Sequence, residues 1–144
     1  MASRTYWKIA AGGIGVLFIV ILQCFIADPV RPGDWRRHSV DENPLFEELA
    51  HFAISRQVRD REYFDTVLEL VDVESQGDAT IYRIKFKTTE STCGITETYS
   101  KRLCLPRSRG VIKDTCTAVF FIFPWLNNER SLYSFSCEGN SVSA

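Results

Sequence analysis

Apolar residues recur three and four positions apart between Asn43 and Val58, which is the spacing of one face of an α-helix. Asn43 is a favourable N-cap residue, and Pro44 suits the first helical position because its missing N–H is not needed there. The sequence therefore predicts a helix that begins at Pro44 and buries one apolar stripe. The stripe consists of Phe46, Leu49, Ala50 and Ala53.

After the helix the period changes to two, which is typical of strands that bury one face. In the second strand segment, for example, Tyr82, Ile84 and Phe86 alternate with basic residues. Gly77 and Asp78 indicate a tight turn before that segment. The predicted strands are Tyr63–Gln76, Thr80–Thr89, Thr115–Phe123 and Ser131–Glu138.

One helix followed by four hairpin-joined strands predicts the α+β class, because the helix stripe needs an apolar partner and one face of an antiparallel sheet provides it. Residues 28–42 are weakly patterned and predict an N-terminal arm, with a short strand around Trp35. Residues 43–144 form the rest of the domain, and the domain proper is predicted at 33–138.

Residues 1–27 have the form of a secretory signal peptide, because two basic residues precede an uncharged apolar run from Ile9 to Ala27. The small Ala27 suits the cleavage position, whereas Phe25 is bulky for its place. An uncleaved signal anchor is the alternative, since the run is close to the roughly 20 residues that span a bilayer. We expect cleavage, and therefore a secreted, extracellular protein without membrane attachment.

The charge balance predicts no nucleic-acid partner. Lys and Arg together number 17, and Asp and Glu number 18. Loss of residues 1–27 removes two basic residues and no acidic one, so the mature chain has a net charge near −3. The densest basic run, 101–113, contains no aromatic residue, and we expect a solvated loop there rather than an anion site.

Five cysteines are present, and Cys24 lies in the signal segment. The remaining four are an even number in a short secreted chain, which predicts two disulfides with three possible pairings. A zinc site is the alternative, but no C-x-x-C pair exists and His38 and His51 lie far upstream. The four residues are Cys93, Cys104, Cys116 and Cys137.

Catalysis requires a nucleophile with a base beside it. His38 lies in the arm and His51 lies on the helix away from the stripe, so both are expected to be solvated. Disulfide formation leaves no free thiol, and no G-x-S-x-G, H-E-x-x-H or glycine-rich phosphate motif is present. We therefore predict no enzyme activity, no catalytic residue, no metal site and no cofactor.

Trp125 follows Pro124 between the last two predicted strands. An aromatic side chain at an exposed turn is suited to anchoring an interface. The alternative is a tryptophan that folds back onto its own sheet, and the spacing does not separate the two arrangements.

In this combination the sequence resembles the secreted type 2 cystatins, and its helix, "NPLFEELAHFAISRQ", is especially similar to that of tick salivary cystatins. The resemblance covers Gly33 to Cys137 and includes the glycine in the arm, the helix, a hairpin that begins with Gln76, and Pro124-Trp125. It implies a cystatin-like antiparallel sheet wrapped around one long α-helix. The disulfides that it implies are sequential, Cys93–Cys104 and Cys116–Cys137.

The resemblance also implies a function, because cystatins are reversible inhibitors of papain-like cysteine proteases. It implies a protease partner of the cathepsin L, S or B type and a monomeric inhibitor without a cofactor. Three segments are implied to enter the protease cleft together: the arm, the first hairpin loop and the Pro-Trp turn. The implied protease-binding residues are Gly33, Gln76, Gly77, Asp78, Ala79, Thr80, Pro124 and Trp125.

The first hairpin loop departs from the family's Q-x-V-x-G motif, because Asp78 stands at the valine position and Thr80 at the final glycine position. A carboxylate in a desolvated cleft costs several kcal/mol unless it is neutralised. A β-branched threonine also resists the positive φ that glycine accepts. We therefore expect weakened inhibition. The alternative is a non-inhibitory secreted binding module of the cystatin fold, with a different protein partner.

Overall fold

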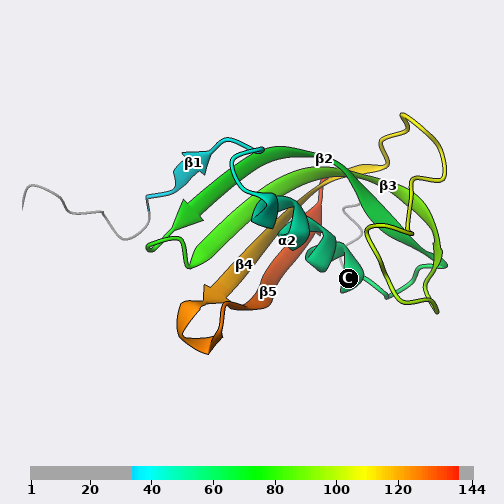
Figure 1. Cartoon of the computed structure of the whole chain (residues 1–144). Helices are drawn as coiled ribbons and strands as arrows, with labels where there is room; N and C mark the ends of the chain where they lie inside the picture. The colour runs from blue at the N-terminus through cyan, green and yellow to red at the C-terminus, as the bar shows by residue number, and fades with distance from the viewer. Residues whose placement is uncertain (1–33, 140–144) are drawn as a thin grey trace, which may run out of the picture. The chain divides into compact units, whose positions relative to one another are not determined.

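A computed structural model describes residues 34–139, in which a five-stranded antiparallel sheet curves around one helix (Figure 1). Strands that follow one another in sequence are also neighbours in the sheet, in the order β1-β2-β3-β4-β5. This confirms the predicted α+β class and the antiparallel sheet wrapped around one helix. The predicted signal peptide and Gly33 lie outside the described residues. The elements are β1 (Arg36–His38), α2 (Pro44–Ser55), β2 (Tyr63–Gln76), β3 (Ile81–Gly94), β4 (Asp114–Phe123), the 3-10 turn η1 (Pro124–Leu126) and β5 (Glu129–Cys137).

The helix α2 begins where the sequence predicts. The side-chain oxygen of Asn43 accepts a hydrogen bond from Leu45 N at 3.0 Å, which satisfies one of the free amides of the first turn. All four residues of the predicted stripe are at most 2% exposed, and Ile54 is buried with them. The helix ends at Ser55, and Arg56 caps it through its backbone N–H.

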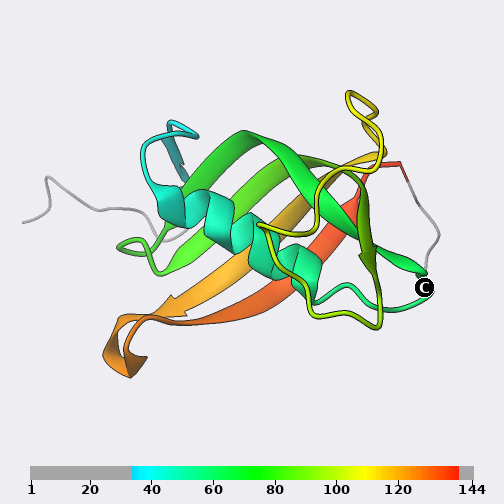
Figure 2. The same cartoon turned by 45° about the vertical axis from the view of Figure 1, so that its right-hand side comes forward.

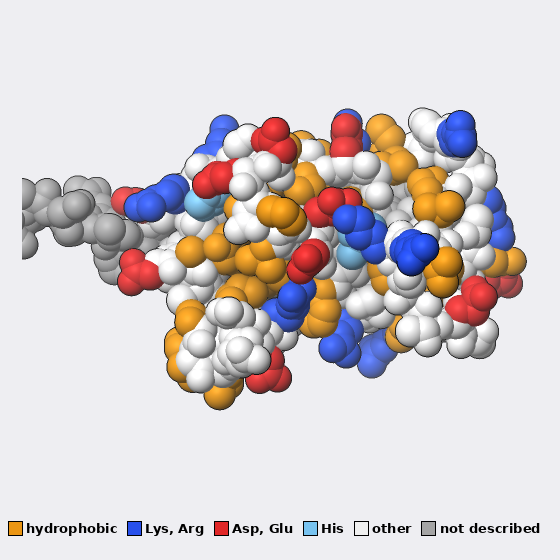
Figure 3. Space-filling view, in the orientation of Figure 1, with side chains coloured by type: hydrophobic (Ala, Val, Ile, Leu, Met, Phe, Trp, Pro, Cys, Tyr) orange, Lys and Arg blue, Asp and Glu red, His pale blue; other side chains and the backbone are white. Residues whose placement is uncertain are grey.

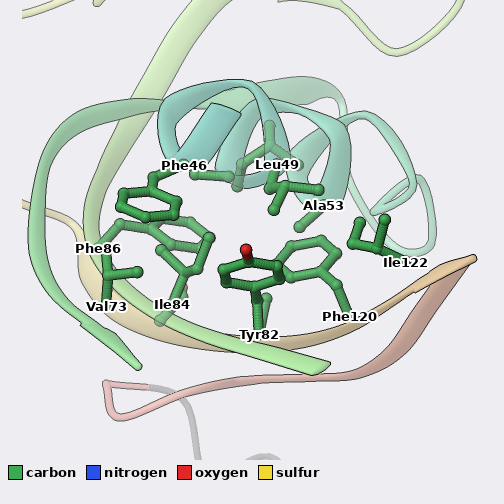
Figure 4. Close-up of a cluster of buried hydrophobic side chains, with 13 residues drawn as sticks. Phe46, Leu49, Ala53, Val73, Tyr82, Ile84, Phe86, Phe120 and Ile122 are labelled. Carbon is green, nitrogen blue, oxygen red and sulfur yellow. The ribbon is translucent and has the colours of Figure 1, made fainter. Parts of the chain in front are cut away.

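The core lies between α2 and the concave face of the sheet, where side chains of the helix point at side chains of β2, β3 and β4 (Figure 4). Tyr82, Ile84 and Phe86 of β3 are 8%, 0% and 0% exposed, which confirms the face predicted from the period of two. Burial of each large apolar side chain contributes about 1.5–3 kcal/mol. The other labelled sheet residues of this core are Val73, Phe120 and Ile122.

The hairpin of β2 and β3 is longer than predicted, because pairing continues from the first turn to Tyr63 opposite Gly94. The polar residues after Thr89 gave no strand pattern, yet their backbone still pairs. Three register shifts interrupt the pairing between residues 63 and 72. Irregularities of this kind bend a strand and increase its twist, which lets the hairpin curve over the helix (Figure 2).

Both disulfides have the sequential pairing that the family resemblance implies. Cys93–Cys104 joins the end of β3 to the connection that follows it, and Cys116–Cys137 cross-links β4 to β5. The paired residues are 11 and 21 positions apart in sequence. By restricting the unfolded chain, each cross-link of this length contributes about 3 kcal/mol.

The β3–β4 connection carries the basic run, which is exposed as predicted but is tied to the domain by ion pairs. Lys101 Nζ lies 2.9 Å from a carboxylate oxygen of Glu47 in α2, and Lys113 Nζ lies 2.9 Å from one of Asp65 in β2. Asp65 is only 3% exposed and also contacts Arg61, so two cations neutralise a buried carboxylate. These lysines therefore bind carboxylates of their own chain.

His51 is buried, so the prediction that it is solvated was wrong. It is 8% exposed, and its Nδ1 lies 2.5 Å from the hydroxyl of Tyr99 in the β3–β4 connection. The same hydroxyl lies 3.2 Å from Thr66 Oγ1 of β2. The connection returns to the helix and covers this position, and the helix sequence alone does not reveal a partner 48 residues away.

Burial lowers the pKa of His51, and the positive charge of Lys101 lowers it further, while Glu47 acts in the opposite direction without reversing the shift. A carboxylate oxygen of Glu47 lies 3.7 Å from Nε2 of the imidazole. The neutral imidazole can therefore accept a hydrogen bond from the Tyr99 hydroxyl at Nδ1 and keep its proton on Nε2, which faces Glu47. In this form His51 links the helix to the connection without carrying a charge into the interior.

We predict that His51→Gln makes the stability of the protein less dependent on pH. Because the pKa of His51 is lower in the folded state, the unfolded state binds more protons below about pH 6.5, and the wild type loses stability as the pH falls. The free energy of unfolding, measured with urea, should fall more between about pH 7.5 and about pH 5 for the wild type than for the variant.

Tyr99→Phe is the control for this prediction. It removes the hydroxyl but keeps the burial of His51 and the nearby charge of Lys101, the two causes that lower its pKa, so most of the wild type's pH dependence should remain. If the free energy of unfolding falls equally between the two pH values in the wild type and in His51→Gln, the prediction is wrong.

Candidate functional site

The β2–β3 turn and the β4–β5 turn lie side by side at one end of the sheet (Figure 1 and Figure 2). Ile81, the first residue of β3, is the register partner of Phe121 in β4. Beside this pair, Ile122 N donates a hydrogen bond to Thr80 O at 2.7 Å. The structure thus brings together every candidate site residue except Gly33, which lies outside the described residues.

The arm approaches the same end of the sheet through β1. Arg36 is the register partner of Ser75, the residue next to Gln76. This strand confirms the short strand predicted around Trp35. The chain therefore enters the sheet beside the first hairpin loop.

Three consecutive residues of the first hairpin loop are left-handed, with φ of 60° at Gly77, 53° at Asp78 and 59° at Ala79. Glycine accepts this conformation freely and aspartate tolerates it, whereas it costs about 1–2 kcal/mol at an alanine. Thr80 closes the turn twice: its N–H and its hydroxyl both donate to Gly77 O, at 3.1 and 2.5 Å.

Thr80 itself lies outside the left-handed region, which corrects the expectation that it resists the backbone of this loop. The positive φ values fall at residues 77 to 79, so position 80 has no need of glycine. A glycine there would also lose the side-chain hydrogen bond to Gly77 O. Thr80 is therefore part of what holds the turn.

Asp78 and Ala79 are exposed at the tip of the loop, whereas Gln76 is half-buried. In the free protein the carboxylate of Asp78 is hydrated, and it loses that water in a dry cleft. A partner that covers the tip must therefore supply a cation, a hydrogen-bond donor or water.

Trp125 is 71% exposed in the turn between β4 and β5. Its ring meets that of Phe123 edge-on, with the ring centroids 5.5 Å apart. Asn127 and Asn128, with φ of 56° and 58°, then direct the chain into β5. Trp125 contacts the Phe123 ring, and most of its surface is exposed. Of the two arrangements that the sequence left open, this favours an exposed tryptophan over one that folds back onto its sheet.

The sequence did not single out two further aromatic residues near Trp125, which are Phe121 and Tyr133. The ring centroid of Phe121 lies 6.5 Å from that of Phe123 and 5.1 Å from that of Tyr133, which is 70% exposed. They lie on the outer face of the sheet, since Phe120 beside them faces the core. The signal was present in the stretch "FFIF", because a period of two sends alternate side chains to opposite faces.

On the helix side of this edge, a hollow of about 350 Å³ lies between the two turns and the start of α2. Figure 3 shows hydrophobic side chains gathered there, between the helix and the β4–β5 turn. The hollow thus has an apolar floor with polar groups at its rim. It is lined by Leu45, Ala79, Tyr82, Ile122, Pro124, Asn128 and Arg130.

This edge has the exposed groups of a docking surface. Within residues 34–139, no group of three or more His, Cys, Asp or Glu side chains is placed to hold a metal ion. In the same range no helix is long and apolar enough to cross a membrane. The exposed side chains of the two turns include Trp125, Leu126, two asparagines and Asp78, a mixture of apolar and polar groups of the kind found at protein interfaces.

We predict that Ala79→Gly stabilises the protein by about 1 kcal/mol or less, because relief of the left-handed alanine is partly offset by the chain entropy of glycine. Thr80→Gly is the matched control in the same loop, and it should destabilise because it removes the hydroxyl that bonds Gly77 O. Urea unfolding measures both differences. The opposite order of the two variants would show that the strain is not at Ala79.

No protein-family profile matches this chain, but individual relatives do. Mialostatin from Ixodes ricinus is 47% identical over 110 residues, which cover 74% of this chain and 76% of mialostatin. Salivary cystatin-L from Ixodes scapularis is 41% identical over 142 residues, which cover 96% of this chain and 98% of that protein.

Solved structures of tick cystatins show the same fold. The crystal structure of mialostatin, a gut cystatin from the hard tick Ixodes ricinus, has a TM-score of 0.68 at 41% identity and covers 75% of this chain and 100% of its own. The salivary cystatin of the soft tick Ornithodoros moubata has a TM-score of 0.68 at 38% identity and covers 75% and 99%. In sequence and in fold, therefore, the chain belongs to the cystatin family, as a type 2 cystatin of the tick group.

Proposed function

We propose that this chain is a secreted, reversible inhibitor of papain-like cysteine proteases of the cathepsin L, S or B type. It acts as a monomer, without a cofactor and without enzyme activity, after residues 1–27 are removed as a signal peptide. The observation that carries the proposal is the adjacency of the two turns, where Ile122 N bonds to Thr80 O at 2.7 Å. The salivary and gut cystatins among its relatives support secretion.

Three segments dock into the protease cleft together. The tip of the first hairpin loop, from Gln76 to Thr80, enters the middle of the cleft. Pro124-Trp125 packs on one side of it, and the arm at Gly33 extends on the other. Tryptophan is among the residues that dominate interface energies once they are buried, and Trp125 is 71% exposed in the free protein.

Both turns are ordered before docking. Two hydrogen bonds from Thr80 close the first loop, and the second turn is closed by the pairing of Phe123 with Glu129 at the adjoining ends of β4 and β5. A surface that is already ordered loses little conformational entropy on binding, so more of its contact energy appears as affinity. The four cysteines of the domain are paired in disulfides and offer the protease no free thiol, which supports non-covalent and reversible binding.

Asp78 supports a second candidate function, a non-inhibitory binding module with a different secreted partner. Its carboxylate is exposed at the centre of the docking edge. A protease cleft that excludes water without offering a cation would resist this charge. A partner with a cation at the corresponding place would accept it.

Titration of papain and of a cathepsin L-type protease with the mature protein tests the inhibitory function, and we expect inhibition below micromolar concentration. Asp78→Asn should then tighten inhibition up to about a hundredfold, because it removes a carboxylate whose unpaired burial costs about 3 kcal/mol and because asparagine tolerates the φ of 53° at this position. Asp78→Val is the comparison: it removes the same charge but is β-branched and strained at this φ, so its gain should be smaller. No inhibition at micromolar concentration by the wild type or by Asp78→Asn would leave the binding module as the function.

Trp125→Ala should weaken inhibition about thirtyfold, which corresponds to the loss of about 2 kcal/mol at an interface hot spot. Leu103→Ala is the control, because Leu103 is 70% exposed, close to the 71% of Trp125, but lies in the β3–β4 connection and not in either turn. It should leave the inhibition constant unchanged. Similar losses in both variants would mean that the protease does not dock on the two turns.

A further inference from the structure

We propose that Trp35, held in place by Arg83, positions the N-terminal arm for entry into the protease cleft. The proposal rests on the inhibitory function proposed above and adds to it two residues that lie outside the docking turns. Only Asp34 separates Trp35 from Gly33 in the sequence. A fixed Trp35 therefore restricts where the arm can extend.

The contact between the two residues is a cation–π stack. The guanidinium carbon of Arg83 lies 4.1 Å from the centroid of the Trp35 ring. Arg83 also forms an ion pair with Glu74, its register partner across β2 and β3, whose side chain is only 17% exposed. Because a shielded carboxylate orients the guanidinium, the cation is held over the indole ring.

His38 fixes the other end of β1, on the helix side of the sheet. Its Nε2 lies 2.7 Å from Ser75 Oγ, and its ring centroid lies 5.6 Å from that of Phe46 and 6.4 Å from that of Tyr82. β1 has only three register pairs with β2. A short edge strand with few contacts opens readily, so the side-chain contacts at its two ends are needed to hold it, and Trp35 is the one nearest the arm.

An arm that continues from a fixed residue has fewer conformations to lose on docking than one that continues from a frayed strand. Trp35 is thus a positioning residue, which acts through the arm and not by contact with the protease. Loss of the stack should weaken inhibition only while the arm is present. A general contribution to the fold would weaken inhibition with or without the arm.

The test is a double-mutant cycle on the mature chain with papain. The four proteins are the mature chain, Trp35→Ala, a chain that starts at Asp34, and that shorter chain with Trp35→Ala. The described residues, 34–139, belong to one compact unit, and the truncation removes no described strand or helix. Each inhibition constant is measured under the same conditions.

We expect Trp35→Ala to weaken inhibition about three- to thirtyfold in the mature chain, the range for a cation–π contact. In the truncated chain the same substitution should change inhibition by less than about twofold, the limit for independent sites. An equal loss in both chains, or no loss in the mature chain, would overturn the proposal.

Arg83→Gln tests the same contact from the other residue. It removes the cation but can still donate a hydrogen bond to Glu74, so it should reproduce the arm-dependent loss. Lys87→Gln is the matched control, because Lys87 forms the corresponding ion pair with Glu69 across the same two strands, four residues further along β3. It should leave inhibition unchanged. If it weakens inhibition as much as Arg83→Gln, the effect comes from the loss of a positive charge on this hairpin and the proposal fails.

A readout without protease separates this proposal from the inhibitory function. Of the three tryptophans, Trp7 lies in the signal segment, so Trp125→Phe leaves Trp35 as the only one in the mature chain. In that background Arg83→Gln should increase the quenching of Trp35 fluorescence by acrylamide. Unchanged quenching overturns the stack. Increased quenching without inhibition of any tested protease overturns the inhibitory function, and the positioning role with it.

Discussion

The apolar face of α2 is buried in the concave face of the sheet, and the rest of the structure depends on that contact. Phe46, Leu49 and Ala53 of the helix meet residues such as Ile84 and Phe120 of the sheet, and all five are at most 2% exposed. Protein interiors are packed almost as densely as crystals, so the sheet cannot flatten without opening a cavity under the helix. The fixed curvature keeps the two turns together at one end. A surface of this kind keeps nearly the same shape when it binds a partner and when it leaves it.

The opposite end of the domain is held by contacts of other kinds. There the β3–β4 connection is attached by the disulfide Cys93–Cys104, by the ion pair of Lys113 with the buried Asp65, and by the hydrogen bond of Tyr99 to His51. None of these side chains lies in either docking turn. The stability of the protein at low pH therefore depends on one end of the domain, and docking depends on the other. Substitutions can change the stability of such an inhibitor without changing its docking surface.

The helix and the strand order were predictable because they depend on local signals, such as the Asn43 cap and the alternation around Ile84. The disulfide pairing followed from the family resemblance. The site was predictable only in part. The sequence placed Trp125 in a turn, but its exposure depends on contact with a single neighbour. It did not reveal that Ala79 is left-handed, because local preference opposes this conformation in a residue with a β-carbon. His51 was assigned to solvent because its partner comes from a distant part of the chain.

The bends in β2 have a consequence for the reach of the binding edge. β2 has 14 residues and α2 has 12, but a strand rises about 3.3 Å per residue and a helix 1.5 Å, so their contour lengths are about 46 Å and about 18 Å. Register shifts curve the strand without shortening it, and both of its ends project beyond the helix. The first hairpin loop is one of these projections. It projects beyond the core and is held in place by its neighbouring strands. A partner can therefore contact the loop without disturbing the hydrophobic interior.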